Sequence, residues 1–157
     1  MGLQDLLSPQ AVIVDLKATC KREVLSALAK ATSELVEGTE TTQIRDALLE
    51  REQLGSTGVG EGVAIPHGKI KGLPKITGVL ARLNQPIDFD SVDAQPVDLV
   101  FLLLAPEDAS AAHLKALAKV SRLLRDEDAR AALRGAETAE GLYAAATAPI
   151  DHSSNAA

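Results

Sequence analysis

Aromatic side chains are almost absent from this chain of 157 residues, which contains no tryptophan, one tyrosine and two phenylalanines. The apolar fraction is nevertheless 46%, an ordinary value for a globular protein. The chain is long enough for one domain with a sizeable buried core and short for two. We therefore expect a core built from leucine, valine, isoleucine and alanine.

Cysteine is also scarce, and long apolar runs are missing. The single Cys20 excludes an intrachain disulfide bond and cannot form a zinc cluster alone, and no sequence feature offers it a partner as a nucleophile. The longest apolar run, 99–105, is far too short to span a bilayer. The start of the chain has no basic segment before an apolar run, so it does not resemble a secretory signal. We predict a cytoplasmic protein without membrane insertion.

Positive charge is not in excess either. The chain has 16 lysines and arginines against 22 aspartates and glutamates, a net charge of −6 and a pI of about 5.0. It therefore lacks the electrostatic footprint of a protein that binds nucleic acid. A mildly acidic surface suits docking onto a basic patch of another protein, and it suits plain solubility equally well.

Apolar residues recur along the chain in patterns that alternate between strand and helix. These patterns predict strands over 11–16, 63–65, 76–83 and 97–104, helices over 19–37 and 41–54, and three further helices between Asp108 and Ala146. The run 97–104, VDLVFLLL, is almost continuously apolar, as in a strand covered on both faces. We predict an α/β fold, a three-layer α/β/α sandwich with a mixed, mainly parallel sheet flanked by helices.

Particular residues are expected to bound and orient these elements. Thr19, Asp126 and Thr138 can cap helices. Leu54 and Leu114 follow the helical spacing of the apolar positions and are expected to point inward. Residues 1–148 are predicted to form a single domain. The polar segment 149–157, which contains His152, is predicted to be a disordered tail.

Residues 55–69, GSTGVGEGVAIPHGK, combine five glycines with a single histidine. Several common motifs are excluded by spacing. Gly68-Lys69 is not followed by serine or threonine as in a phosphate-binding P-loop, and Gly58, Gly60 and Gly62 do not fit G-x-G-x-x-G. The nucleophile elbow G-x-S-x-G and the metalloprotease motif HExxH are also absent. The stretch is therefore not a common nucleotide or hydrolase loop.

The histidine of this stretch is expected at the carboxyl end of a strand. His67 directly follows the predicted strand 63–65, with Pro66 fixing the entry and Gly68 permitting a sharp exit. His113 lies in the first turn of the helix after strand 97–104. If these strands are parallel neighbours, the two histidines meet at one sheet edge beside a helix N-terminus that favours an anion. A surface histidine and glycines that only mark turns remain open alternatives.

A longer pattern resolves these alternatives by resemblance. The stretch RE-x-x-GSTG-x-G-x-G-x-AIPHGK, residues 51–69, resembles the phosphorylation-site signature of enzyme IIA proteins of the bacterial sugar phosphotransferase system. The fructose–mannitol class is implied, and within it the nitrogen-regulatory enzyme IIA. The segment 86–106 and the His-Leu pair at 113–114 match in the same order. The resemblance covers residues 3 to 147.

The resemblance implies a role for each matched residue. His67 would accept a phosphoryl group from a small histidine phosphocarrier protein, as tele-phosphohistidine. His113 would stabilise the phosphorylated ring, and Arg51 would offset phosphoryl charge. The phosphate loop would consist of Gly55, Ser56, Thr57, Gly58, Gly60, Gly62 and Gly68. Glycine-rich backbone can approach phosphoryl oxygens closely and offer them N–H donors. No metal and no cofactor is required, because the carrier delivers an activated phosphoryl group.

Other functions stay open at this point. A sugar-transport enzyme IIA would relay the phosphoryl group to a IIB domain, but this chain shows no IIB module. A binding module on the same fold could have lost phosphorylation, and a metal-dependent hydrolase could use His67 and His113. Relatives of the regulatory kind act on sensor kinases, potassium transport systems or alarmone enzymes, and no sequence motif selects among these partners.

Overall fold

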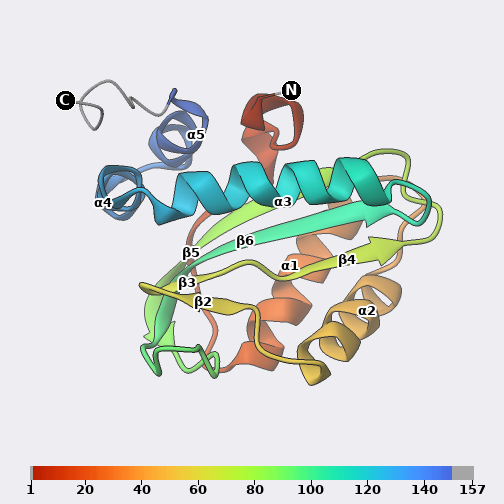
Figure 1. Cartoon of the computed structure of the whole chain (residues 1–157), viewed down its shortest axis with the longest axis horizontal. Helices are drawn as coiled ribbons and strands as arrows, with labels where there is room; N and C mark the ends of the chain where they lie inside the picture. Colours follow the sequence, from red (N-terminus) through yellow and green to blue (C-terminus); the bar gives the residue numbers. More distant parts are fainter. Residues whose placement is uncertain (1, 150–157) are drawn as a thin grey trace.

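The computed structural model describes residues 2–149, and its centre is a mixed sheet between two layers of helices (Figure 1). The predicted tail lies, apart from Pro149, outside the described residues. The strands are β1 (Val12–Leu16), β2 (Gly58–Gly60), β3 (Val63–Ala64), β4 (His67–Ile70), β5 (Thr77–Ile87) and β6 (Val97–Pro106). The helices are α1 (Lys21–Leu35), α2 (Thr41–Gln53), α3 (Ser110–Arg125), α4 (Glu127–Gly135) and α5 (Ala139–Thr147). Two short 3-10 turns, Leu3–Asp5 and Pro9–Ala11, precede β1.

The sheet order is β1-β5-β6-β3-β2, and β4 also pairs with β6. The pairs β1–β5, β3–β6 and β4–β6 are parallel, whereas β5–β6 and β2–β3 are antiparallel. Figure 1 shows α3, α4 and α5 on one side of this sheet and α1 and α2 on the other. The predicted three-layer α/β/α fold with a mixed, mainly parallel sheet is confirmed.

Strand β6 forms the middle of the core, as its apolar run predicts. Its residues from Leu99 to Ala105 are all inaccessible to solvent. Helix α3 packs along one face of β6, and the core extends through β5 to α1. Phe89 and Phe101 are the only aromatic residues in this core of otherwise aliphatic side chains in the described part of the chain. The expected aliphatic core is therefore present.

The strands differ from the sequence prediction in two ways. Strand β5 continues past the expected break at 84–86, because its backbone bulges there: Arg82 pairs with Leu99 and Ile87 with Val97. Five residues of β5 thus span two of β6, which accommodates Pro86 without a ladder hydrogen bond. The second difference is that two short strands were not predicted: β2, and β4, which begins at His67.

Two of the three predicted helix caps, Asp126 and Thr138, are confirmed, and the cap predicted at Thr19 is wrong. Asp126 accepts a hydrogen bond from the amide of Ala129, and Thr138 accepts one from Gly141. At α1 the cap residue is Cys20, which is exposed, and Thr19 instead donates its amide and hydroxyl to the Glu23 carboxylate. The helix therefore starts two residues later than predicted.

Candidate functional site

His67 lies where two short strands join beside β6. β3 pairs with β6 up to Ala64, residues 65 and 66 interrupt the pairing, and β4 resumes it with His67 opposite Leu103. His67 therefore opens a strand instead of only following one, and its ring is half-buried. The sharp exit expected at Gly68 is wrong, since Gly68 continues β4 opposite Leu104.

The hydrogen bonds of His67 define its tautomer. Nδ1 lies 2.8 Å from the carbonyl oxygen of Ile65, which can only accept a hydrogen bond, so Nδ1 carries the proton. Nε2 then has a free lone pair, and the Nε–H of Arg51 points to it at 3.4 Å. The same guanidinium donates through Nη1 to the carbonyl oxygen of Gly55 at 2.9 Å. The nucleophilic nitrogen of His67 thus faces a cation.

His113 meets His67, as the topology predicted. The ring centroids are 5.8 Å apart and the rings cross at 67°. The side chain is nearly buried, and Nε2 has no hydrogen-bond partner within residues 2–149. Burial lowers the pKa of His113 below its ordinary value of 6.5, and repulsion from His67, when that ring is protonated, and from Lys69 lowers it further. His113 is therefore held neutral beside His67.

A second cation near the histidines was missed by the sequence reasoning. Lys69 lies two residues after His67 on β4 and donates to Oγ of Ser110, the first residue of α3, at 2.6 Å. The cap residue of α3 is Ala109, whose side chain offers no acceptor to the first-turn amides. Lysine and helix N-terminus together make this end of α3 attractive to an anion. The alternation of residues along a strand could have placed Lys69 beside His67.

Two of the glycines assigned to the phosphate loop lie farther from His67. Gly60 pairs with Val63, whose partner Leu99 is four residues along β6 from Leu103, the partner of His67. That offset corresponds to about 13 Å of strand. At Gly62, with φ +77°, a Cβ would lie 3.0 Å from Oδ1 of Asp98 and closer still to the Arg134 guanidinium. Strand pairing at Gly60 and close packing at Gly62 explain these two glycines structurally. Their binding of phosphate stays a prediction.

The donors of the remaining loop are mostly engaged. The hydroxyl of Ser56 donates to the carbonyl oxygen of Phe89, and the amide of Gly58 donates to Oγ of Ser56 at 3.0 Å. Both the amide and the hydroxyl of Thr57 donate to the carboxylate of Glu52. The side chain of Glu52 is only 6% exposed. The loop is thus ordered by its own side chains.

Two leucines at the site point outward, contrary to expectation. Leu54, just after α2, is 83% exposed, and Leu114, next to His113, is 69% exposed. Their helical spacing suggested burial. However, Leu54 follows the end of α2 at Gln53, and Leu114 lies on the side of α3 that faces away from β6. Exposed large apolar residues beside a polar site are typical of surfaces that bind another protein.

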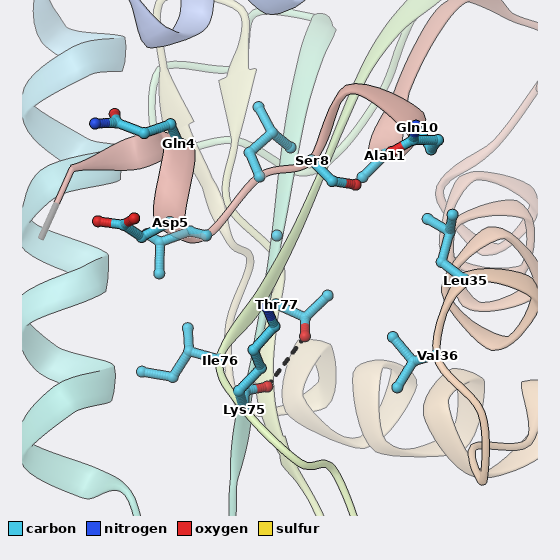
Figure 2. A pocket seen from close by; sticks show the side chains of 13 residues that line it. Gln4, Asp5, Ser8, Gln10, Ala11, Leu35, Val36, Lys75, Ile76 and Thr77 are labelled. Carbon is cyan, nitrogen blue, oxygen red and sulfur yellow. Dashed lines mark hydrogen bonds between the residues drawn. The ribbon is translucent and has the colours of Figure 1, made fainter.

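Four hollows of the described surface are lined by residues other than His67, His113 and Arg51. One, of about 290 Å³, lies between the N-terminal segment, the end of α1 and the start of β5, and Figure 2 shows Asp5, Leu35 and Lys75 around it. His67 is half-buried and lines none of these four hollows.

The part of the chain that the structure describes contains no group of three histidine, cysteine or acidic residues placed to hold a metal ion. Within the same residues, no helix is long and apolar enough to cross a membrane.

The chain is similar to known proteins over most of its length. The model of the family described as "Phosphoenolpyruvate-dependent sugar phosphotransferase system, EIIA 2" matches residues 5–147. The nitrogen regulatory protein of Bradyrhizobium diazoefficiens is 51% identical over 149 residues, covering 95% of this chain and 97% of that protein. The nitrogen regulatory protein of Pseudomonas aeruginosa is 38% identical over 141 residues, covering 90% and 92%. The crystal structure of nitrogen regulatory protein IIA-Ntr from Neisseria meningitidis has 32% identity and a TM-score of 0.86, covering 92% of this chain and 99% of that one.

Proposed function

The chain belongs to the EIIA 2 family of the phosphoenolpyruvate-dependent sugar phosphotransferase system, and from this premise we propose that it accepts a phosphoryl group on His67 and regulates partner proteins by its phosphorylation state. The donor is a histidine phosphocarrier protein. The observation that carries the proposal is the tautomer of His67, whose free lone pair on Nε2 faces Arg51. The product is therefore the tele-phosphohistidine.

The transfer needs no proton to leave His67. The Nε2 lone pair forms a new bond to phosphorus while the P–N bond of the carrier's phosphohistidine breaks, and the bonding electron pair stays on the carrier's imidazole. Nδ1 keeps its proton throughout and donates a hydrogen bond to the carbonyl oxygen of Ile65. This carbonyl stabilises the positive charge that the His67 ring acquires on phosphorylation.

The charge of the added group is offset by the residues around Nε2. A phosphoryl group brings nearly two negative charges and several acceptor oxygens. Arg51 is already directed at Nε2, His113 stacks edge-on against the ring, and Lys69 lies on the same strand. A neutral His113 can donate one N–H, so it can hydrogen-bond a phosphoryl oxygen without binding the group too tightly to be transferred.

Regulation is the second half of the proposal. The two relatives described above and the crystal structure from Neisseria carry the name nitrogen regulatory protein, and they match nearly the full length of this chain. The exposed Leu54 and Leu114 offer an apolar contact beside His67 for the carrier and for a regulated protein in the cytoplasm. We propose that residues 1–148 act as one unit in both contacts. Relay of the phosphoryl group to a IIB domain is the alternative outcome.

The test is reconstitution with phosphoenolpyruvate, enzyme I and the histidine phosphocarrier. Intact-mass spectrometry should show one acid-labile phosphoryl group per chain, and ³¹P–¹H NMR should place it on Nε2. His67→Ala should remove it while circular dichroism shows an unchanged fold. Label that persists in His67→Ala, or a group on Nδ1, contradicts the proposal. Rapid passage of the group to a IIB protein would favour the sugar-transport role.

A further inference from the structure

A buried carboxylate lies directly behind the phosphoryl-accepting surface. Glu52 is the residue after Arg51 near the end of α2, and its side chain is only 6% exposed. Its oxygens accept the amide of Thr57 at 3.2 and 3.3 Å and also the hydroxyl of Thr57. Nζ of Lys21, the first residue of α1, lies 3.0 Å from Oε2. We call Lys21, Glu52 and Thr57 the Glu52 clamp.

This arrangement is more than an ordinary turn requires. A buried carboxylate loses hydration worth several kcal/mol, and this loss destabilises the fold unless the group is paired and hydrogen-bonded. A neutral side chain could fix a surface loop without that loss. The ion pair and hydrogen bonds of the clamp compensate this loss. They also join three separate segments, which are the start of α1, the end of α2 and the loop before β2. Lys21 also reaches Oδ2 of Asp90 at 3.3 Å and lies 5.1 Å from the centre of the Phe89 ring.

The clamp closes the loop that carries one of the two anchors of Arg51. The guanidinium donates to Nε2 of His67 and to the carbonyl oxygen of Gly55. Gly55 lies between Glu52 and Thr57, and its amide donates to the carbonyl oxygen of Glu52 at 3.2 Å. If Thr57 were released from Glu52, the Gly55 carbonyl would lose its fixed position, and one of the two anchors of the guanidinium with it.

The partner of Glu52 matters for charge as well. Among residues 2–149 the carboxylate forms its ion pair with Lys21 and not with the adjacent Arg51. The negative charge of Glu52 is thereby neutralised from α1, and Arg51 stays available for His67. An unpaired carboxylate so near would compete with a phosphoryl group for that guanidinium.

We infer that Glu52 is a positioning residue for phosphoryl transfer: through Thr57 and Lys21 it holds the loop 53–57 so that the Arg51 guanidinium faces Nε2 of His67. The inference rests on the proposed function of His67. Glu52 acts through Arg51 and does not touch the phosphoryl group. A displacement of the guanidinium by about 1 Å is enough to lower the transfer rate by up to about 100-fold.

The test compares Glu52→Gln and Thr57→Val with two matched variants. Glu50→Gln changes an exposed carboxylate on the same helix, and Thr57→Ser keeps the hydroxyl. In the unphosphorylated protein, ¹⁵N NMR of the His67 ring and of Arg51 Nε reports their hydrogen bond directly. We expect both signals to move in Glu52→Gln and Thr57→Val and to stay in place in Glu50→Gln and Thr57→Ser.

The kinetic arm measures phosphoryl transfer from the carrier. We expect the rate at saturating carrier to fall about 10- to 100-fold in Glu52→Gln and Thr57→Val, with the carrier concentration for half-maximal rate nearly unchanged. Glu50→Gln should stay within about threefold of the native chain, and Thr57→Ser, which keeps the hydroxyl, should recover most of the rate lost in Thr57→Val. Unfolding in urea shows how much each substitution lowers stability.

Each outcome bears on the inference. Unchanged ¹⁵N signals in Glu52→Gln overturn it, and so does a loss of stability without displacement of Arg51. A native chain that takes no phosphoryl group from the carrier would refute the proposed function instead. The NMR comparison would in that case still decide whether the Glu52 clamp positions Arg51.

Discussion

Removing the Arg51 side chain should shift the phosphoryl equilibrium between carrier and His67. Arg51 approaches Nε2 to 3.4 Å, so its charge would lie about 4 Å from a phosphoryl group on that atom. Two unit charges at about 4 Å attract by about 4 kcal/mol at an effective dielectric constant of about 20. Both side chains are half-buried, and solvent screening reduces this attraction to about 1–2 kcal/mol.

An energy of about 1–2 kcal/mol corresponds to about 5- to 30-fold in an equilibrium constant. We therefore expect Arg51→Ala to move the equilibrium toward the phosphorylated carrier by that factor. Arg51→Lys should recover part of the loss, because it keeps the charge but not the fork of donors. Incubation of each variant with phosphorylated carrier, followed by intact-mass spectrometry at equilibrium, gives the ratio.

Arg45→Ala is the matched control, since Arg45 lies on the same helix and pairs only with the neighbouring Asp46 within the described residues. It should leave the equilibrium within about twofold of the native chain. An Arg51→Ala equilibrium that is equally unchanged would refute the reasoning, because a cation at this distance cannot leave a dianion unaffected. The effect should also shrink as salt is raised.

Three further predictions concern His113, the exposed leucines and the glycines. Burial lowers the pKa of His113, so as the pH falls below 6.5 the unfolded chain binds a proton at this residue before the folded chain does. Urea unfolding should therefore show that the native chain loses stability between pH 7.5 and 5.5 relative to His113→Gln. Parallel plots of unfolding free energy against pH for the two chains would contradict this. Leu54→Glu and Leu114→Glu should slow transfer from the carrier without lowering the unfolding free energy, whereas Leu35→Glu, at the hollow of Figure 2, should not slow it. Gly58→Ala should destabilise the fold by about 1–3 kcal/mol, because its Cβ would lie 3.1 Å from Cα of Ser91, while Gly68→Ala meets nothing within 4 Å and should be neutral in thermal unfolding.

The layers of the fold follow from sequence periodicity, and local chemistry fixes many of the boundaries. The continuous apolar run of β6 predicts a strand covered on both faces, and Asp126 and Thr138 cap their helices as their side chains allow. Short strands escape this reasoning. β4 has four residues and β2 three, too few for a period to show, and their pairing with β6 and β3 depends on contacts far along the chain. Leu54 and Leu114 show the opposite error, since helical spacing alone does not tell where a helix leaves the core.

The two histidines were placed together by topology, but the groups around them were not. Parallel pairing of β3 and β4 with β6 brings His67 to the start of α3, and strand order is enough to predict that meeting. The tautomer of His67 is set by the carbonyl of Ile65, and a backbone acceptor leaves no trace in the sequence. Glu52 was likewise invisible, because its burial depends on Lys21 arriving from another helix.

These contacts change the physical explanation of the glycine-rich stretch. Gly58 and Gly62 allow close packing against Ser91 and Arg134, and several donors of the loop are engaged within the protein. The charge of a phosphoryl group on Nε2 would then be offset mainly by the side chains around His67, which reach it from α2 and α3. Ile65 is buried, whereas Leu54 and Leu114 are exposed, so the apolar surface that we propose for a partner is formed by these two leucines. Phosphorylation would place nearly two negative charges beside that surface, and a partner that covers it must then desolvate them. A regulated protein that binds there should therefore prefer the unphosphorylated chain, without any rearrangement of the core.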